Sequence, residues 1–240
     1  GHVPSSFRIA RQLLSRLENE QTGEILIKGL HVDIPQHRIK ETENLVSILG
    51  NEVIEEFPWK NNMKPSTNDN VEGVLRRTWR PALSIVGSDG LPPTANAGNV
   101  LRPYTTLQLS MRIPPTTDAS MAKEKINSVL LDNVPYQAKV SLDFEEAACG
   151  WNAPETSSWL LEAIEKASNK YYGEDPCSIG EGGTIPFMAM LGEQFPKAQF
   201  VITGVLGPHS NAHGPNEFLH IPFAKKLTCC ISSIISDFKK

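Results

Sequence analysis

The chain has 240 residues, of which 40% are hydrophobic and 21% charged, and its formal net charge is -4 at pH 7. This composition is that of a folded globular protein, and no apolar run approaches the length of a membrane span. The charge is spread along the chain, which argues against nucleic acids and anionic membranes as main partners because both select for clustered Lys and Arg. Small-molecule and peptide ligands stay open, and the length favours two domains.

The first part of the chain reads as helix, strand, helix and loop. After Pro4, apolar residues at helical spacing predict a helix that stops near Gly23. The same rules predict a short strand at 25–27, a second helix over 36–57 and its end at Pro58. The polar segment 60–73 is expected to be a long surface loop.

The next segment predicts a sheet of three strands, with a helix between the last two strands along the chain. Alternating apolar and polar residues predict strands at 82–86, 105–113 and 139–144, and the segment from Thr117 or Asp118 to Leu131 predicts a helix between the last two. The split βαβ layout would need one more strand before the first helix, so the chain is expected to begin inside a domain. A three-stranded sheet under two helices is the alternative.

The second part alternates helices and strands, which predicts an α/β domain from Trp151 onward. Its predicted elements are a helix at 157–172, a Gly-rich turn at 180–186, a short helix through Met190 and Leu191, a buried strand at 200–205, a loop at 207–221 and a last helix with Pro222 in its first turn.

The cysteines favour a reducing compartment. Cys229 and Cys230 are adjacent, which is a poor geometry for pairing with each other, and with Cys149 and Cys177 they match no zinc-finger spacing. All four are interpreted as reduced core residues of a cytosolic protein.

The loop at 207–221, GPHSNAHGPNEFLHI, is the first candidate site. It places His209, His213 and Glu217 on a turn where a metal or an acid/base site could form. A zinc site needs at least three protein ligands, however, so His213 by itself also fits a loop residue that only makes hydrogen bonds.

Three further features could bind a ligand. In the turn GEGGTIP at 180–186, backbone N–H groups could bind a carboxylate, or the turn could be tight without a ligand. Arg112, at the end of a strand, could clamp a carboxylate or could be a solvated cation. Asn99, in the AGN turn before the long strand, could bind a ligand but reads first as a turn residue.

Five short motifs together resemble a known family. GEGGTIP, SNAHGPNE, SMRIPP, AGN and WRPALSIVG occur between Arg80 and Glu217 in the order found in the cocatalytic zinc metallopeptidases of the carnosinase, cytosolic nonspecific dipeptidase and aminoacylase type. The resemblance implies a ferredoxin-like α+β lid domain at 1–150, which also makes a homodimer, and the C-terminal part of an α/β catalytic domain at 151–240.

The resemblance also implies roles for single residues. His213 matches the family's C-terminal metal ligand, and the metal is zinc, two per active site, or manganese in its place. Glu181 matches a residue near the substrate's amino end, and the turn residues Gly182, Gly183 and Thr184 match those that receive its polar groups. Arg112 and Asn99 match lid residues that hold the substrate carboxylate or the oxyanion, the Asn across the dimer.

The chain departs from the family in one respect. The other metal ligands and the general-base Glu of these enzymes lie upstream of the lid, in a region that this sequence does not contain, and His2 only neighbours the position of the lid histidine. We therefore expect a cytoplasmic parent enzyme that cleaves short peptides by metal-activated water, and an inactive 240-residue portion. The alternative is a non-catalytic dimerisation or binding module derived from the same fold.

Overall fold

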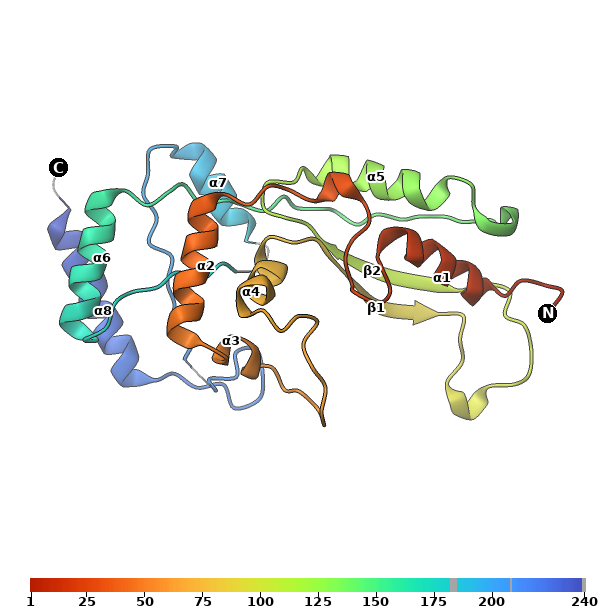
Figure 1. Cartoon of the computed structure of the whole chain (residues 1–240), viewed down its shortest axis with the longest axis horizontal. Coiled ribbons are helices and arrows are strands. Elements are labelled where there is room, and N and C mark those ends of the chain that lie inside the picture. The colour runs from red at the N-terminus through yellow and green to blue at the C-terminus, as the bar shows by residue number, and fades with distance from the viewer. Residues whose placement is uncertain (182–184, 208, 239–240) are drawn as a thin grey trace.

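The computed structural model describes residues 1–181, 185–207 and 209–238. The sheet lies with α1 and α5 at one end of an elongated molecule, α6 and α8 lie at the other end, and the termini point in opposite directions (Figure 1). The helices are α1 (Ser6–Leu17), α2 (Gln36–Leu49), α3 (Glu52–Glu55), α4 (Asn70–Thr78), α5 (Ala119–Leu131), α6 (Ser158–Tyr171), α7 (Pro186–Gln194) and α8 (Ile221–Asp237). The strands are β1 (Ala82–Asp89) and β2 (Thr106–Arg112), and the 3-10 turns are η1 (Lys28–Leu30), η2 (Thr94–Asn96) and η3 (Pro135–Gln137).

The sheet is a single antiparallel pair. Ala82 at the start of β1 lies opposite Arg112 at the end of β2, and the register shifts at a bulge between Ile85 and Gly87. Both strands were predicted by the alternation of apolar and polar residues, and both are confirmed. The pairing fixes Arg112 at the end of the sheet that faces α4 and α7 (Figure 1).

Three predicted strands are wrong. Segments 139–144 and 200–205 carry no strand, and at 25–27 the structure has only one isolated bridge, between Glu18 and Ile25. The physical reason is the same in each case: a strand needs a neighbour to complete its ladder of hydrogen bonds, and alternation of side chains does not supply one. In 139–144, Val140 and Leu142 still pack against the core.

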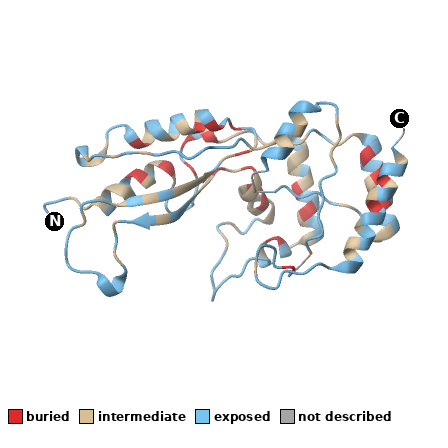
Figure 2. Ribbon diagram, turned by 180° about the vertical axis from the view of Figure 1, so that it is seen from behind, coloured by how far each residue is buried: buried red, intermediate tan, exposed pale blue. Residues whose placement is uncertain are grey.

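The main core lies between the sheet and two helices. Helix α1 begins where the side chain of Ser5 accepts a hydrogen bond from the amide of Arg8, and α5 begins at Asp118 in the same way. Their apolar faces meet over the sheet, as the buried residues in Figure 2 show. The buried members are Leu13, Leu17, Ile25, Ile27, Leu30, Ala122 and Leu130.

The predicted helix at 36–57 is interrupted. Gly50 has φ +57, a conformation that glycine adopts more easily than other residues, and this ends α2 before the short α3 begins. The predicted loop at 60–73 is also too long, because Asp69 caps α4 by accepting from the amides of Val71 and Glu72. Helices α2, α3 and α4 share a small core of Leu45, Val53 and Val74.

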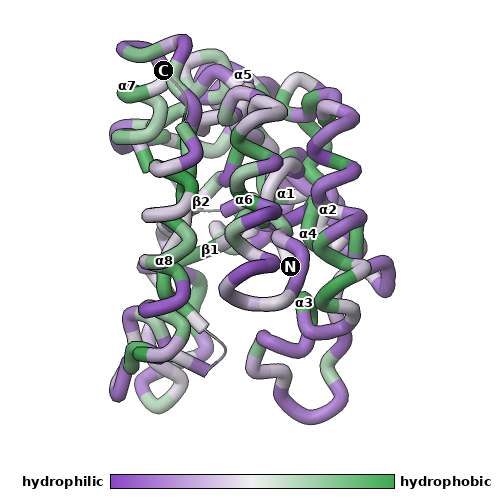
Figure 3. Tube along the Cα trace, turned by 90° about the vertical axis from the view of Figure 1, so that its left-hand side faces the viewer, coloured by the Kyte–Doolittle hydropathy of each residue, from purple (hydrophilic) through white to green (hydrophobic). Residues whose placement is uncertain are grey.

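Helices α6 and α8 pack against each other at the C-terminal end. Leu160, Ala163, Ala167, Cys230 and Ile234 are buried between them. All four cysteines are free, as predicted, but the core assignment holds only for Cys230, since the other three are exposed. Hydrophobic and hydrophilic stretches alternate along α2, α6 and α8 (Figure 3). Among the described residues, no helix is long and apolar enough to cross a membrane.

Candidate functional site

The loop that leads into α8 is held by its own hydrogen bonds. The amide of Phe218 donates to the carbonyl of Ser210 at 3.1 Å, and the side chain of Asn211 donates to the carbonyl of Pro215 at 2.6 Å. Ser210 is buried. Helix α8 then begins at His220, whose Nδ1 accepts from the amide of Phe223 at 3.1 Å. The loop is therefore closed by short-range contacts on both sides of its tip.

His213 lies at this tip and is exposed. Its backbone amide donates to Oε2 of Glu217 at 3.3 Å. In this hydrogen bond the Glu217 carboxylate binds the backbone of the loop and not the imidazole ring of His213. His209 and His213 both have a left-handed backbone, with φ 64 and 61. The loop therefore presents His213 on a turn that is fixed by Glu217.

Within the described residues, no group of three or more His, Cys, Asp and Glu side chains is close enough together to hold a metal ion. His213 can provide one imidazole, whereas a zinc site takes at least three protein ligands. The described part of the chain thus fits one ligand of a metal centre, not a complete one.

Arg112 and the Gly-rich turn lie near the same end of the sheet. Arg112 is exposed at the last position of β2, and its strand partner Ala82 follows α4 by four residues. On the other side, a Cβ placed on Gly180 would lie 3.0 Å from Cγ2 of Thr78, the last residue of α4. Gly180, the first residue of the turn, therefore packs on the end of α4, next to the strand end that carries Arg112.

The turn itself is only partly described. Glu181 is exposed. Gly182, Gly183 and Thr184 lie outside the described residues, so the prediction that they receive the polar groups of a ligand stays a prediction. Pro186 opens α7 directly after the turn, in the first turn of the helix where its missing N–H is tolerated.

Asn99 lies elsewhere. It is exposed in the long loop between β1 and β2. This loop lies at the end of the molecule that carries the N-terminus, away from the loop that leads into α8 (Figure 1). The base of this loop is tied to α1, since Ser6 Oγ donates to the carbonyl of Arg102 at 3.2 Å. Within one copy of the chain, Asn99 is not brought together with His213.

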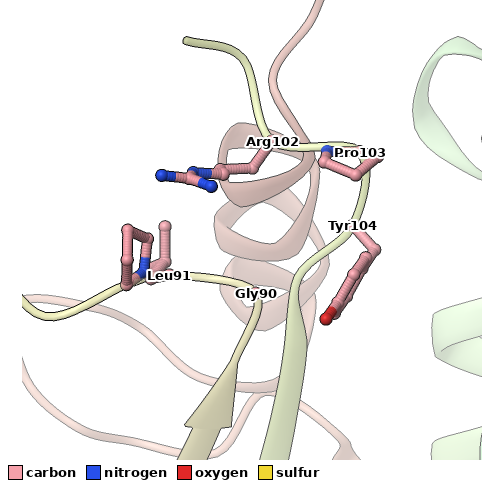
Figure 4. A pocket seen from close by; sticks show the side chains of 6 residues that line it. Gly90, Leu91, Arg102, Pro103 and Tyr104 are labelled. Atoms are coloured by element: carbon pink, nitrogen blue, oxygen red, sulfur yellow. The ribbon is translucent and has the colours of Figure 1, made fainter. Parts of the chain in front are cut away.

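An open pocket of about 330 Å³ lies at the base of the same loop. In Figure 4, Arg102 points over Leu91, whereas Tyr104 points away on the other side. The lining residues are Gly90, Leu91, Pro92, Arg102, Pro103 and Tyr104. The sequence gives no indication of this pocket, because its two sides come from segments that are ten or more residues apart.

Comparisons with known proteins support the family resemblance. No family model matches the chain. Curated relatives include a cysteinylglycine-S-conjugate dipeptidase of Corynebacterium striatum, which is 29% identical over a match that covers 61% of this chain and 33% of the relative. They also include a Cys-Gly metallodipeptidase of Saccharomyces cerevisiae, which is 27% identical over a match that covers 88% of this chain and 44% of the relative. The chain thus spans less than half the length of each of these relatives.

The solved structures agree on the fold. The structure of human carnosine dipeptidase 1 superposes on 99% of this chain with a TM-score of 0.70 and 19% sequence identity, and the match covers 50% of that protein. At this level of identity the likeness shows the mixed α/β fold alone.

Proposed function

We propose that this chain, which belongs to the metallodipeptidase family, is the C-terminal part of an enzyme that cleaves short peptides or similar amide bonds. The relatives named above are dipeptidases, which supports a hydrolase. Because the chain spans less than half of each relative, the activity belongs to the whole protein. We expect the isolated 240 residues to be inactive.

The observation that supports a metal site best is the closed loop that presents the His213 imidazole. We assign His213 as one ligand of a two-metal centre that holds zinc, or manganese in its place. The remaining ligands and the general base would come from residues that this chain does not contain, since the described residues form no larger ligand group. A bound metal of this kind supplies an activated water and polarises the scissile carbonyl.

The residues of this chain would bind and orient the substrate. Arg112 has the planar, forked guanidinium that pairs with a carboxylate at two points. Glu181 would face the amino end of the peptide, and the turn 182–184 would receive its polar groups. The packing of Gly180 on Thr78 supports this assignment, because it brings the first residue of the turn close to the strand end that carries Arg112.

A homodimer would complete the site. We propose that residues 1–150 form a ferredoxin-like lid and that Asn99 serves the active site of a second copy. The position of the loop between β1 and β2, which contains Asn99, supports this role, because this loop lies away from the His213 loop of its own copy (Figure 1). The free cysteines suit a cytoplasmic enzyme.

The ligand assignment is tested by two matched variants of the whole protein. Asn tolerates the left-handed backbone that both histidines have, so His213→Asn and His209→Asn change the side chain with little backbone strain. We expect His213→Asn to lose one metal per site and most dipeptidase activity, and His209→Asn to keep both. Metal content is measured by mass spectrometry of the desalted protein. Unchanged metal content in His213→Asn would reject the assignment.

A second experiment tests the need for the rest of the protein. The 240-residue chain is incubated with zinc or manganese and a set of dipeptides, next to the protein expressed with its natural flanking sequence. We expect turnover only in the longer protein. Turnover by the 240-residue chain at the same rate would contradict the proposal, and a longer protein without turnover would favour the binding module.

A further inference from the structure

Residues 150–153 connect the sheet to the C-terminal helices, and this connector is packed on both sides. A Cβ placed on Gly150 would lie 2.5 Å from Cα of Pro115, so the two backbones are in direct contact. Pro115 follows Arg112 by three residues. The connector therefore touches the segment that leaves the Arg112 end of β2.

The next residue of the connector contacts α7. A Cβ placed on Gly192 would lie 2.7 Å from Nε1 of Trp151, so the indole packs directly on this helix. The ring of Trp151 also packs edge-on against Phe200, with centroids 5.0 Å apart. Helix α7 begins at Pro186, the last residue of the Gly-rich turn. The connector therefore contacts the helix that follows this turn and also the segment that follows Arg112.

A single arginine holds the connector in place. Arg38, in the first turn of α2, donates from Nε to Oδ1 of Asn152 at 3.2 Å and from Nη2 to the carbonyl of Ala153 at 2.6 Å. Its Nη1 donates to Oε2 of Glu41 at 2.8 Å. The side chain is only 18% exposed, so these bonds are screened less than those of a surface ion pair.

We propose that Arg38 is a positioning residue: by clamping the connector it fixes α7 relative to the Arg112 end of β2. The three donor positions of one planar guanidinium have separate partners, so a change in the angle of the connector would break at least one of these bonds. Arg38 acts on the site only through the connector. The part of the inference that concerns substrate rests on the proposed function.

The clamp is tested on the 240-residue chain with a protease that cleaves after Glu. Glu155 is exposed just beyond the connector, and Glu20 is an exposed reference site far from it. We expect Arg38→Met to speed cleavage after Glu155 about tenfold, the factor that corresponds to the loss of a charged hydrogen bond. Cleavage after Glu20 should not change, and neither site should respond to Arg11→Met, an exposed arginine of α1.

A double-mutant cycle shows whether the partner is the one proposed. If Arg38 acts through Asn152, then adding Asn152→Ala to Arg38→Met should change cleavage much less than Asn152→Ala does alone. Independent effects of the two substitutions, or wild-type cleavage after Glu155 in Arg38→Met, would overturn the clamp. Equal acceleration after Glu20 and Glu155 would do the same, because it would show general unfolding.

The link to the site is tested in the whole protein. We expect Arg38→Met to raise KM for a dipeptide severalfold with a smaller change in kcat, and Arg38→Lys to recover part of the loss. Faster cleavage after Glu155 in Arg38→Met together with an unchanged KM would reject the positioning role. If the wild-type protein does not cleave dipeptides at all, the proposed function fails, whereas the cleavage experiment on the connector still decides whether Arg38 is the clamp.

Discussion

Two adjacent leucines of α6 offer a matched test of the C-terminal packing. Leu160 is 1% exposed in the core between α6 and α8, whereas Leu161 is 54% exposed. Replacing a fully buried leucine by alanine removes its apolar contacts and leaves a cavity, which costs about 3–5 kcal/mol. The same change at a half-exposed position removes about half of a burial free energy of ~1.5–3 kcal/mol, so Leu161→Ala should cost about 1 kcal/mol.

Urea unfolding followed by far-UV circular dichroism measures the difference. With a slope of about 2 kcal/mol per molar urea, Leu160→Ala should move the midpoint by about 1.5 M or more, and Leu161→Ala by about 0.5 M. The reactivity of Cys230 gives a local second probe, because its thiol is buried in the same core. Equal midpoints for the two variants would refute the assignment of this core.

Three further predictions concern packing, capping and pH. Gly150→Ala should lower the melting temperature because its Cβ would overlap the facing proline backbone at 2.5 Å, whereas Gly98→Ala, with open space around it, should leave the temperature unchanged. Asp69→Ala removes the cap of α4 and should cost about 1 kcal/mol in urea unfolding. Burial raises the pKa of the Cys230 thiol, with a smaller contribution from the charge of its neighbour Cys229. The Cys230 thiol of the unfolded chain therefore ionises at a lower pH than that of the folded chain. The free energy of unfolding should fall as the pH rises above about 8.5, and it should fall less in Cys230→Ser.

The helices could be predicted because their signals are local. Apolar residues at helical spacing predicted α5, α6 and α8 to within about two residues, and Asp118, one of the two predicted starts, caps α5. Helix α1 starts where it was predicted, but it ends at Leu17 and not near Gly23. Two further misjudged helical regions have local causes. Gly50 divides the helix predicted at 36–57, and the Asp69 cap was hidden in a polar segment.

The strands were harder to predict because pairing depends on distant residues. The segments 105–113 and 139–144 alternate equally well, yet only the first has a partner in the described chain. The apolar run at 200–205 reads as a buried strand, but Val201 and Ile202 are 41% and 59% exposed. Sequence alternation therefore identified which residues can face a core, and the structure decided which of them have a neighbour.

In the candidate site, too, the sequence predicted individual residues but not their contacts. Its candidate residues were predicted from five short motifs that together resemble a family, and their roles stay predictions. The arrangement of these residues could not be predicted: the contact of Gly180 with Thr78 joins residues about a hundred positions apart, and the bonds of Arg38 to the connector span 114 and 115 positions. Arg38 had no sequence signal, since an arginine in the first turn of a helix is ordinary by itself.

The backbone of the His213 loop agrees with the ligand role proposed for His213. Four of its non-glycine residues, His209, Asn211, His213 and Asn216, have positive φ, a conformation that is uncommon outside glycine and in which Asn, Asp and His are the more frequent exceptions. The loop adds little to a core, since Ser210 is the only buried residue among its described positions 207 and 209–221. Strain of this kind costs of order 1 kcal/mol per residue and persists where the surrounding structure fixes it. Here the hydrogen bonds of the loop fix it while His213 stays exposed, which is the arrangement expected of a side chain held ready for a ligand.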